Sequence, residues 1–219
     1  ALMDRYHDET KVYEAGALVE PTSVSYNAIF SRAGGFKPGA YAVVFGAGPI
    51  GLAAVALCKA AGAAKVIVFE VSENRRGLAT QVGADYVFDP RAVVPAEVIM
   101  DLTGGEGADF QVEAAGAPHI TLLQMERAMA INCKIVQIGR AAQRVPLYLE
   151  HFQVRRAQIY GAQGHSGDAN FPNVIRLMAS GLIDLRPIIT ARYKLEDVVD
   201  AIRQSTERRD GKIMVTMTD

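Results

Sequence analysis

Three glycines occur in a spacing that suits phosphate binding. Gly46, Gly48 and Gly51 form a G-x-G-x-x-G pattern that follows an apolar run, 41–46, and precedes a helical pattern from Pro49. The first glycine permits a tight turn, the second lets the backbone approach a pyrophosphate, and the third lets helix and strand pack closely. The amino end of such a helix presents free N–H groups to phosphates. The pattern therefore predicts a dinucleotide-binding turn, although glycine-rich turns also occur for steric reasons alone.

A carboxylate follows at the end of the next predicted strand. Glu70 falls 19 residues after Gly51, close to the spacing at which an acid meets the adenosine ribose. Such a carboxylate accepts hydrogen bonds from both ribose hydroxyls and repels a 2′-phosphate, so it favours NAD over NADP. The alternative is a solvated strand end, and Arg75 and Arg76 are cations that could hold a 2′-phosphate. The combination of turn, strand, helix and acid predicts NAD, with both arginines on a solvated helix face and Arg75 toward the adenosine.

A parallel sheet is needed to position these residues. Short β-rich runs alternate with longer helical patterns, which is typical of β-α-β units. The predicted strands are 41–46, 65–70, 85–89, 109–115, 134–139 and 157–162. The predicted helices are 49–61, 73–82, 95–102, 119–130 and 169–180, with Gly62, Gly83, Gly104 and Gly181 at helix ends. The fold class is therefore α/β, with a doubly wound six-stranded parallel Rossmann sheet.

The two ends of the chain do not follow this alternation. An irregular lead-in precedes a predicted linker helix, 19–32, that ends at Gly34-Gly35, and the C-terminal part contains a helix, 195–205, and a strand, 213–218. We expect the ends to belong with a second structure. The chain then divides into three parts. Residues 1–36 form a lead-in with the linker helix, 37–165 form a dinucleotide-binding domain, and 166–219 form C-terminal helices with a strand.

Composition excludes several classes of protein. The 219 residues are 50% hydrophobic and 21% charged, with a formal net charge of −1, so disorder and nucleic-acid binding are disfavoured. No apolar run approaches the length of a membrane span. The cysteines, Cys58 and Cys133, lie far apart in apolar contexts, which indicates buried free thiols in a reducing compartment. These features predict a cytoplasmic protein without a membrane or nucleic-acid partner.

Longer segments resemble a known family. The runs LVEPTSVSYNA, FKPGAYAVVFGAGPIGLAAVALCKAAGAAKVIVFE and TGGEGADFQVEAAG resemble the coenzyme-binding half of the medium-chain, zinc-dependent alcohol and polyol dehydrogenases. The runs FQVRRAQIYGAQGHSG and FPNVIRLMASG are most similar to the scyllo-inosose dehydrogenase type of the polyol branch. The resemblance implies hydride transfer between a secondary alcohol or cyclic polyol and NAD, with zinc as Lewis acid. The G-H-E segment that supplies zinc ligands in the family is absent here, so we expect a fragment that binds NAD and is inactive alone.

The resemblance also assigns cofactor-binding residues, which are grouped here by the part of the cofactor that they contact. The phosphate turn and the apolar contact to the nicotinamide are Gly46, Gly48, Pro49, Ile50 and Gly51. The residues at the adenosine ribose are Glu70 and Arg75. The strand ends lining the cofactor are Ala115, Gly116, Ile138, Gly139 and Arg140. The backbone groups that hold the carboxamide are those of Ala162 and Gly164. Val24 faces the nicotinamide, and Lys212 is the basic residue near the pyrophosphate.

Several polar residues keep a structural alternative. The resemblance places Glu20 at or next to the zinc of a complete enzyme, but one carboxylate holds no zinc and a helix-start acid is the simpler interpretation. Lys212 is equally consistent with a solvated lysine. His165 suits a proton relay, yet a loop histidine without a named partner is more often a surface or capping residue. Asp109 and Glu113 share a strand face, and we assign them no chemistry.

Two other functions use the same glycine turn. One is a non-catalytic NAD(H)-binding module that acts through a protein partner. The other is a methyltransferase that binds S-adenosylmethionine, which six strands and the VEP lead-in disfavour. The family resemblance further implies that the last strand of the sheet, near 157–161, pairs with a second copy in a homodimer or homotetramer, because an unpaired apolar edge invites association.

Overall fold

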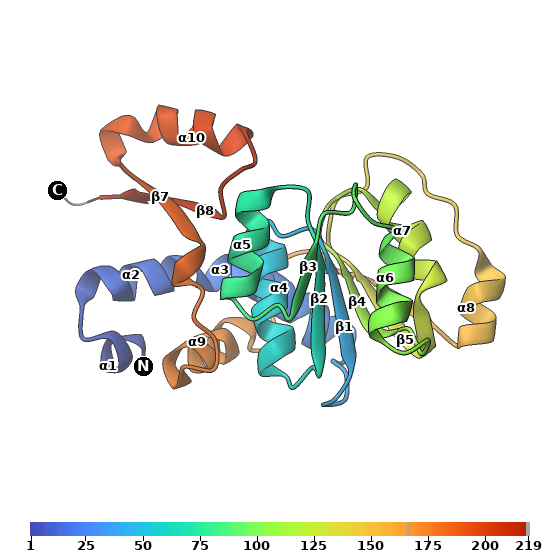
Figure 1. Ribbon diagram of the computed structural model, residues 1–219. Coiled ribbons are helices and arrows are strands. Elements are labelled where there is room, and N and C mark those ends of the chain that lie inside the picture. Colours follow the sequence, from blue (N-terminus) through green and yellow to red (C-terminus); the bar gives the residue numbers. More distant parts are fainter. Residues whose placement is uncertain (166, 218–219) are drawn as a thin grey trace.

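A six-stranded parallel sheet forms the centre of the molecule (Figure 1). The computed structural model describes residues 1–165 and 167–217. The strand order is β3-β2-β1-β4-β5-β6, which is the predicted doubly wound Rossmann arrangement. The strands are β1 Tyr41–Phe45, β2 Lys65–Phe69, β3 Tyr86–Phe88, β4 Ala108–Glu113, β5 Met129–Gln137 and β6 Gln158–Gly161. The predicted fold class is thus confirmed.

Successive residues of each strand enter two different hydrophobic cores. Val44 and Val68 pack on one face of the sheet, whereas Val43 and Ile67 pack on the other, because side chains alternate along a strand. The first face is covered by α3 Val19–Tyr26, α4 Pro49–Ala60, α5 Glu73–Gln81 and α9 Asn170–Ser180, and the second by α6 Pro95–Leu102 and α7 Pro118–Arg127. Across the described residues, no helix has both the length and the apolar character needed to cross a membrane.

The boundary between α7 and β5 differs from the sequence prediction. The predicted helix 119–130 ends at Arg127, and β5 begins at Met129, five residues before the predicted strand. Met129 is buried and pairs with Ala108 of β4, and the register then shifts before Phe110. Pairing with a neighbouring strand and burial of Met129 therefore outweigh the helical propensity of this segment.

The amino-terminal lead-in is helical rather than irregular, so that prediction was wrong. It forms α1 Leu2–Tyr6 and α2 Glu9–Ala17. The Asp8 carboxylate accepts from the Lys11 amide at 3.0 Å and caps α2. The Glu14 side chain on α2 binds Arg192 at 2.5 Å, so an ion pair with a residue distant in sequence holds this helix in place. A charged segment without apolar periodicity gives no indication of such a contact.

The linker helix changes its winding before it ends. The predicted helix 19–32 is α3 followed by a π-helical segment, Asn27–Arg32. Gly34 and Gly35 have φ values of 67° and 65°, and left-handed glycines commonly end helices. The predicted end is therefore confirmed. The π-helical segment buries Ile29 in the core on the first face of the sheet and Asn27 against the loop after β6.

A small C-terminal unit lies apart from the central sheet, at the upper left of Figure 1. It consists of β7 Ile189–Lys194, α10 Val198–Thr206 and β8 Lys212–Thr216, with β7 parallel to β8. The sequence patterns do not indicate β7 or the short helix α8 Leu149–Arg155, and a 3₁₀ turn, Leu195–Asp197, replaces the expected start of the C-terminal helix. The expected strand 213–218 begins one residue earlier, and its last position, Thr218, is outside the described residues.

Candidate functional site

The glycine turn is built from backbone contacts that leave no room for side chains. Gly46 has a φ of 90°, a conformation that glycine adopts readily. A Cβ on Gly46 would lie 2.7 Å from the Ala115 Cα, and a Cβ on Gly51 would lie 1.9 Å from the Gly46 carbonyl oxygen. Both distances are well inside van der Waals contact. Packing therefore requires the first and third glycines of the motif.

The amino end of α4 is left open by Gly48. Gly48 is the N-cap residue, Pro49 follows as the first helical residue, and no side chain caps this end. The Ser25 hydroxyl on α3 donates to the Ile50 carbonyl at 2.7 Å and fixes the first turn of the helix. Uncapped amides and the helix dipole favour an anion at this point. The arrangement can therefore hold a pyrophosphate.

Glu70 stands immediately after β2 and braces the glycine turn. Glu70 is only 6% exposed. One carboxylate oxygen accepts from the Ala47 amide at 2.6 Å and the other accepts from the Ser72 amide at 2.8 Å. Each carboxylate oxygen has a second lone pair, so Glu70 can still accept from ribose hydroxyls. The acid is thus a structural part of the turn as well as a ribose ligand candidate, and it is not the solvated strand end considered above.

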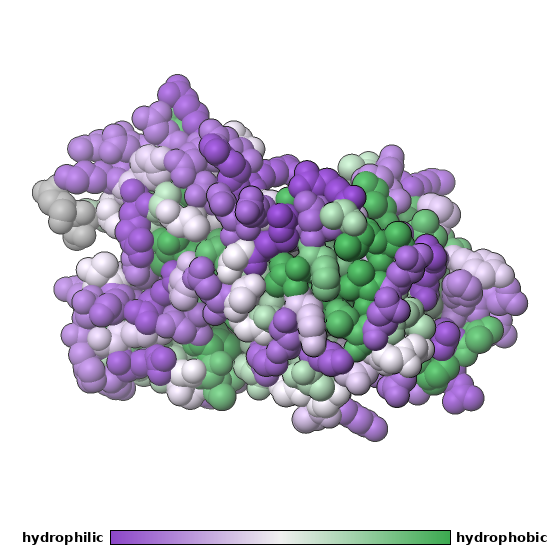
Figure 2. All heavy atoms as spheres, in the orientation of Figure 1, coloured by the Kyte–Doolittle hydropathy of each residue, from purple (hydrophilic) through white to green (hydrophobic). Residues whose placement is uncertain are grey.

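A cleft of about 430 Å³ opens beside the turn. It lies at the carboxyl ends of β1, β2 and β4, where the strand order reverses, and ligands bind at this switch point in doubly wound sheets. Among its lining residues are five of the predicted cofactor residues: Gly46, Gly48, Glu70, Arg75 and Ala115. Its opposite wall is apolar and includes Val93, Val94, Pro95 and Ile120. Figure 2 shows hydrophobic side chains gathered on this face in the region of α6 and α7, which suits an adenine ring.

Arg75 and Arg76 are not a solvated helix face. The Arg75 Nε donates to the Asp210 carbonyl at 2.8 Å. Burial lowers the pKa of Arg75, Glu70 opposes that change, and the charge of Arg208 adds to it. Arg76 instead donates to the Glu70 carbonyl at 3.0 Å and to the Asp89 carboxylate, so it is tied to the backbone. Arg75 alone of the two faces the cleft.

The ends of β4 and β5 approach each other closely. A Cβ on Gly139 would lie 2.4 Å from the Gly116 amide nitrogen. Glu113 is fully buried and accepts from Gln137 Nε2 at 2.8 Å and from the Gly116 amide at 3.3 Å. Asp109, near the other end of β4, accepts from the backbone instead. Glu113 therefore organises the strand ends, and the two carboxylates do not pair. Of the strand-end predictions, those outside the lining of the cleft are Gly116, Ile138, Gly139 and Arg140.

A side-chain network holds the loop after β6 at the other end of this edge. Asn27 Nδ2 donates to the Gly164 carbonyl at 3.0 Å, and Asn170 Nδ2 donates to the His165 carbonyl at 3.3 Å. The Ser31 hydroxyl donates to Asn170 Oδ1 at 2.7 Å. Both asparagines are 1% exposed. We call this set the loop clamp. Sequence reasoning missed it, because isolated asparagines in helices form no recognisable motif.

The loop clamp presents His165 to Glu20. The His165 Nδ1 and Glu20 Oε1 atoms are 3.2 Å apart, so His165 has the partner that the sequence did not reveal. Ala162, whose amide donates to the Gln137 carbonyl at 3.0 Å, begins the same loop. Val24, like Ala162 and Gly164, lies outside the lining of the cleft, and their predicted contacts to a nicotinamide stay predictions.

The predicted basic residue near the pyrophosphate is not the one that lines the cleft. Lys212 begins β8 and is absent from the cleft lining, whereas Arg208 is part of it. The sequence signal for Arg208 was only the charged run ERRDGK. A turn of that composition gives no indication of which cation faces the site.

The described residues do not form a zinc site. They contain no group of three or more histidine, cysteine, aspartate or glutamate side chains placed to hold a metal ion. The Glu20–His165 pair offers two ligands at most, and zinc takes four. Burial raises the pKa of the Cys58 and Cys133 thiols to about 12, so both are unreactive interior side chains. The groups gathered at the glycine turn therefore fit a dinucleotide, and the described residues place no set of zinc ligands beside them.

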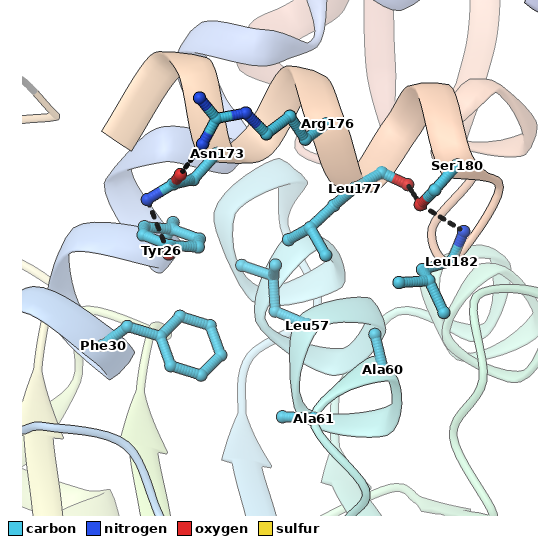
Figure 3. A pocket seen from close by; sticks show the side chains of 10 residues that line it. All are labelled: Tyr26, Phe30, Leu57, Ala60, Ala61, Asn173, Arg176, Leu177, Ser180 and Leu182. Atoms are coloured by element: carbon cyan, nitrogen blue, oxygen red, sulfur yellow. Dashed lines mark hydrogen bonds between the residues drawn. The ribbon is translucent and has the colours of Figure 1, made fainter. Parts of the chain in front are cut away.

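A second hollow, of about 490 Å³, lies away from the glycine turn. Figure 3 shows it between α3, the π-helical segment, α4 and α9, with Leu57 and Leu177 facing each other across it. Ala60 and Ala61 line it at the end of α4 opposite Gly48. The hollow is therefore at the amino edge of the sheet and takes no part in the dinucleotide site.

Comparison with known proteins gives the family. Residues 49–180 match the family model for zinc-binding dehydrogenases, and this match extends over more than half of the chain. The chain belongs to the zinc-binding dehydrogenase family. This zinc-binding dehydrogenase chain spans about half the length of the curated relatives it matches.

Individual relatives of this zinc-binding dehydrogenase chain include polyol dehydrogenases and L-threonine dehydrogenases. It is 47% identical over 206 residues to scyllo-inosose 3-dehydrogenase of Thermotoga maritima, covering 92% of this chain and 52% of the relative. It is 34% identical over 203 residues to L-threonine 3-dehydrogenase of Thermococcus kodakarensis, covering 92% and 57%. A solved structure of 2R,3R-butanediol dehydrogenase from Bacillus subtilis superimposes with a TM-score of 0.83 at 31% identity, covering 94% and 58%.

Proposed function

We propose that this chain is the NAD(H)-binding part of a zinc-dependent dehydrogenase that transfers a hydride between NAD and a secondary alcohol or cyclic polyol. The observation that carries the proposal is the glycine turn, Gly46–Gly51, opening directly onto a cleft that contains Glu70. The open end of α4 would bind the pyrophosphate, and Glu70 would accept from the ribose hydroxyls. When bound, NAD supplies the hydride acceptor of the reaction.

The choice of NAD over NADP depends on the charge of Glu70. Its carboxylate is fixed by two backbone amides and would repel a 2′-phosphate. Arg76, a potential 2′-phosphate ligand, is already bound to Asp89. These contacts favour NAD, although a solved relative from Sinorhizobium meliloti with 27% identity is bound to NADP.

The similarity to scyllo-inosose 3-dehydrogenase supports a cyclic polyol as the substrate class. In this proposal, zinc and most of the substrate pocket are supplied by residues outside the 219 of this chain, because the described residues hold no metal cluster. The chain by itself would then bind NADH and fail to oxidise an alcohol. Among residues 1–165 and 167–217, no contact favours the alternative of a non-catalytic module with a protein partner.

Fluorescence titration with NADH and NADPH tests the proposal directly. We expect the folded chain to bind NADH at least tenfold more tightly than NADPH, and to produce no NADH from NAD and a cyclic polyol. A folded chain that binds neither nucleotide would overturn the proposal. Polyol-dependent NADH formation by this chain alone would overturn the assignment of the missing chemistry to other residues.

We also propose association through the outer edge of β6. Within the part of the chain that the structure describes, this strand is hydrogen-bonded only to β5, and Ile159 on it is 41% exposed. Leu149 and Val154 on the neighbouring helix α8 are 70% and 65% exposed. An apolar open edge of this kind favours pairing with a second copy, as a homodimer or within a homotetramer. Sedimentation equilibrium should show association that Ile159→Lys weakens and Val199→Lys, on α10, leaves unchanged; a monomer at all concentrations would contradict it.

A further inference from the structure

The turn at residues 207–211 reaches the dinucleotide cleft from the far end of the chain. Arg208 lines the cleft together with Arg75 and Gly48. The Arg75 guanidinium joins the two regions, because its Nε donates to the Asp210 carbonyl at 2.8 Å and its Nη1 lies 3.9 Å from the position of a Cβ on Gly48. A segment of the C-terminal unit therefore forms one wall of a site that begins at the glycine turn.

Packing and hydrogen bonds hold this turn in place. A Cβ on Gly211 would lie 2.4 Å from the Ile188 carbonyl oxygen. The backbone at Gly211 therefore packs directly against the backbone at Ile188. The Asp210 carboxylate accepts from Thr190 Oγ1 at 2.7 Å and from Gln204 Nε2 at 3.0 Å. These contacts tie the turn to β7 and α10. The turn therefore has a defined conformation, which positions the Arg208 side chain at the cleft.

Arg208 differs from the other arginines of this part of the chain in its surroundings. Four of them form ion pairs with carboxylates: Arg186 with Asp184, Arg192 with Glu14, Arg203 with Asp200 and Arg209 with Glu207. Within the described ranges, the Arg208 side chain has no hydrogen bond or ion pair. Arg208 instead adds to the effect of burial in lowering the pKa of Arg75. Two guanidinium groups at one cleft repel each other, and an anion between them removes that repulsion.

We propose that Arg208 is a ligand for the phosphate chain of the bound dinucleotide, acting with Arg75 and the open end of α4. The inference rests on the proposed function, since its ligand is the nucleotide assigned to the cleft. A guanidinium matches phosphate oxygens with two parallel N–H donors. The glycine turn supplies backbone donors from one side of the pyrophosphate, and Arg208 supplies charge from the other. Nucleotide binding then also holds the C-terminal unit against the sheet.

The variant Arg208→Asn tests this assignment in the intact 219-residue chain. Asparagine tolerates the left-handed backbone, φ 55°, of this position, so the change removes the charge without adding strain. Arg209→Asn is the matched control, because Arg209 adjoins it in the same turn, binds Glu207 and is not part of the cleft lining. Each variant is titrated with NADH, NADPH, ADP and adenosine, after its thermal unfolding curve has shown that it is folded.

We expect Arg208→Asn to weaken NADH and ADP binding at least fivefold and to leave adenosine unchanged, because adenosine has no phosphate. Arg209→Asn should change each affinity less than twofold, and the loss at Arg208 should shrink in high salt. Equal NADH affinities for Arg208→Asn and the unaltered chain would overturn the inference alone. A loss confined to NADPH would also overturn it, since it would place Arg208 at the 2′-phosphate. If the unaltered folded chain binds none of the nucleotides, this inference falls together with the proposed function.

Discussion

The two halves of the carboxyl edge of the sheet are built in different ways. At the ends of β1, β2 and β4, backbone meets backbone, and a single Cβ on Gly51 would lie 1.9 Å from a carbonyl oxygen. Beyond β6, the buried amides of Asn27 and Asn170 hold the loop through its carbonyl groups. The first construction demands glycine at fixed spacing and leaves a motif. The second needs only side chains of suitable reach, and it leaves no motif.

The largest effect should come from the backbone half. Gly51→Ala places a Cβ against the Gly46 carbonyl, so helix and strand must separate. We expect the free energy of unfolding to fall by about 3 kcal/mol and NADH affinity to fall more than tenfold. Urea denaturation and NADH fluorescence measure the two effects.

Gly77→Ala is the matched control for that change. Gly77 lies in α5, and a Cβ there would meet no atom within 4 Å. Alanine is the better helix former, so we expect stability to rise by about 0.5–1 kcal/mol. Similar losses in both variants would show that Gly51 is not restricted by close packing.

The loop half should respond to loss of a buried amide. Asn170→Ala removes the partner of the Ser31 hydroxyl and the donor to the His165 carbonyl. Because buried polar groups without partners are costly, we expect a loss of about 2 kcal/mol in the free energy of unfolding. Asn173→Ala, which removes a less buried bond to the Tyr26 hydroxyl, should cost about half as much. An equal loss in the two variants would contradict a special role of the loop clamp.

Glu70→Gln changes charge in the backbone half with little change in shape. A glutamine side chain can accept from only one of the two amides that Glu70 now binds, and it no longer repels a 2′-phosphate. We expect the preference for NADH over NADPH to fall about tenfold, which corresponds to about 1.4 kcal/mol. Paired titrations measure the ratio, and an unchanged preference would assign selectivity elsewhere.

The smallest effect should come from the exposed pair that the loop clamp presents. His165→Ala removes the contact to Glu20. The side chain of His165 is 39% exposed and that of Glu20 is 55% exposed. Exposed polar pairs of this kind contribute little, so we expect a change below about 1 kcal/mol in the free energy of unfolding. If this loss equals that of Asn170→Ala, the pair and not the buried amides holds the loop.

The fold class and the positions of most elements were predictable, for a physical reason. Central strands such as β1 and β2 are buried on both faces and therefore form short apolar runs that are easy to recognise. The exceptions depend on distant contacts. Met129 joins β5 because it pairs with β4, and β7 becomes a strand because β8, from the end of the chain, pairs with it.

The candidate site was predictable to a similar degree. Gly46, Gly51 and Glu70 were found from spacing, because the turn, the helix and the acid belong to one β-α-β unit of regular length. Gly51 packs on Gly46 and Glu70 binds Ala47 within that unit, whereas the approach of Gly46 to Ala115 became visible only in the structure. Arg208 and the Glu20–His165 pair were not found from spacing, since each depends on segments more than 100 residues apart meeting in space. Which of several cationic side chains faces a cleft depends on how such distant segments pack against each other.

The sequence by itself determined the doubly wound sheet, the glycine turn and the acid at the end of β2. These features follow from local periodicity and from backbone contacts that only glycine allows. The tertiary structure alone decided that Glu70 braces the turn, that Arg76 is bound to Asp89 and that Arg208 faces the cleft. The reason is that hydrogen bonds and charges act over a few ångströms in space, while a sequence orders residues only along the chain.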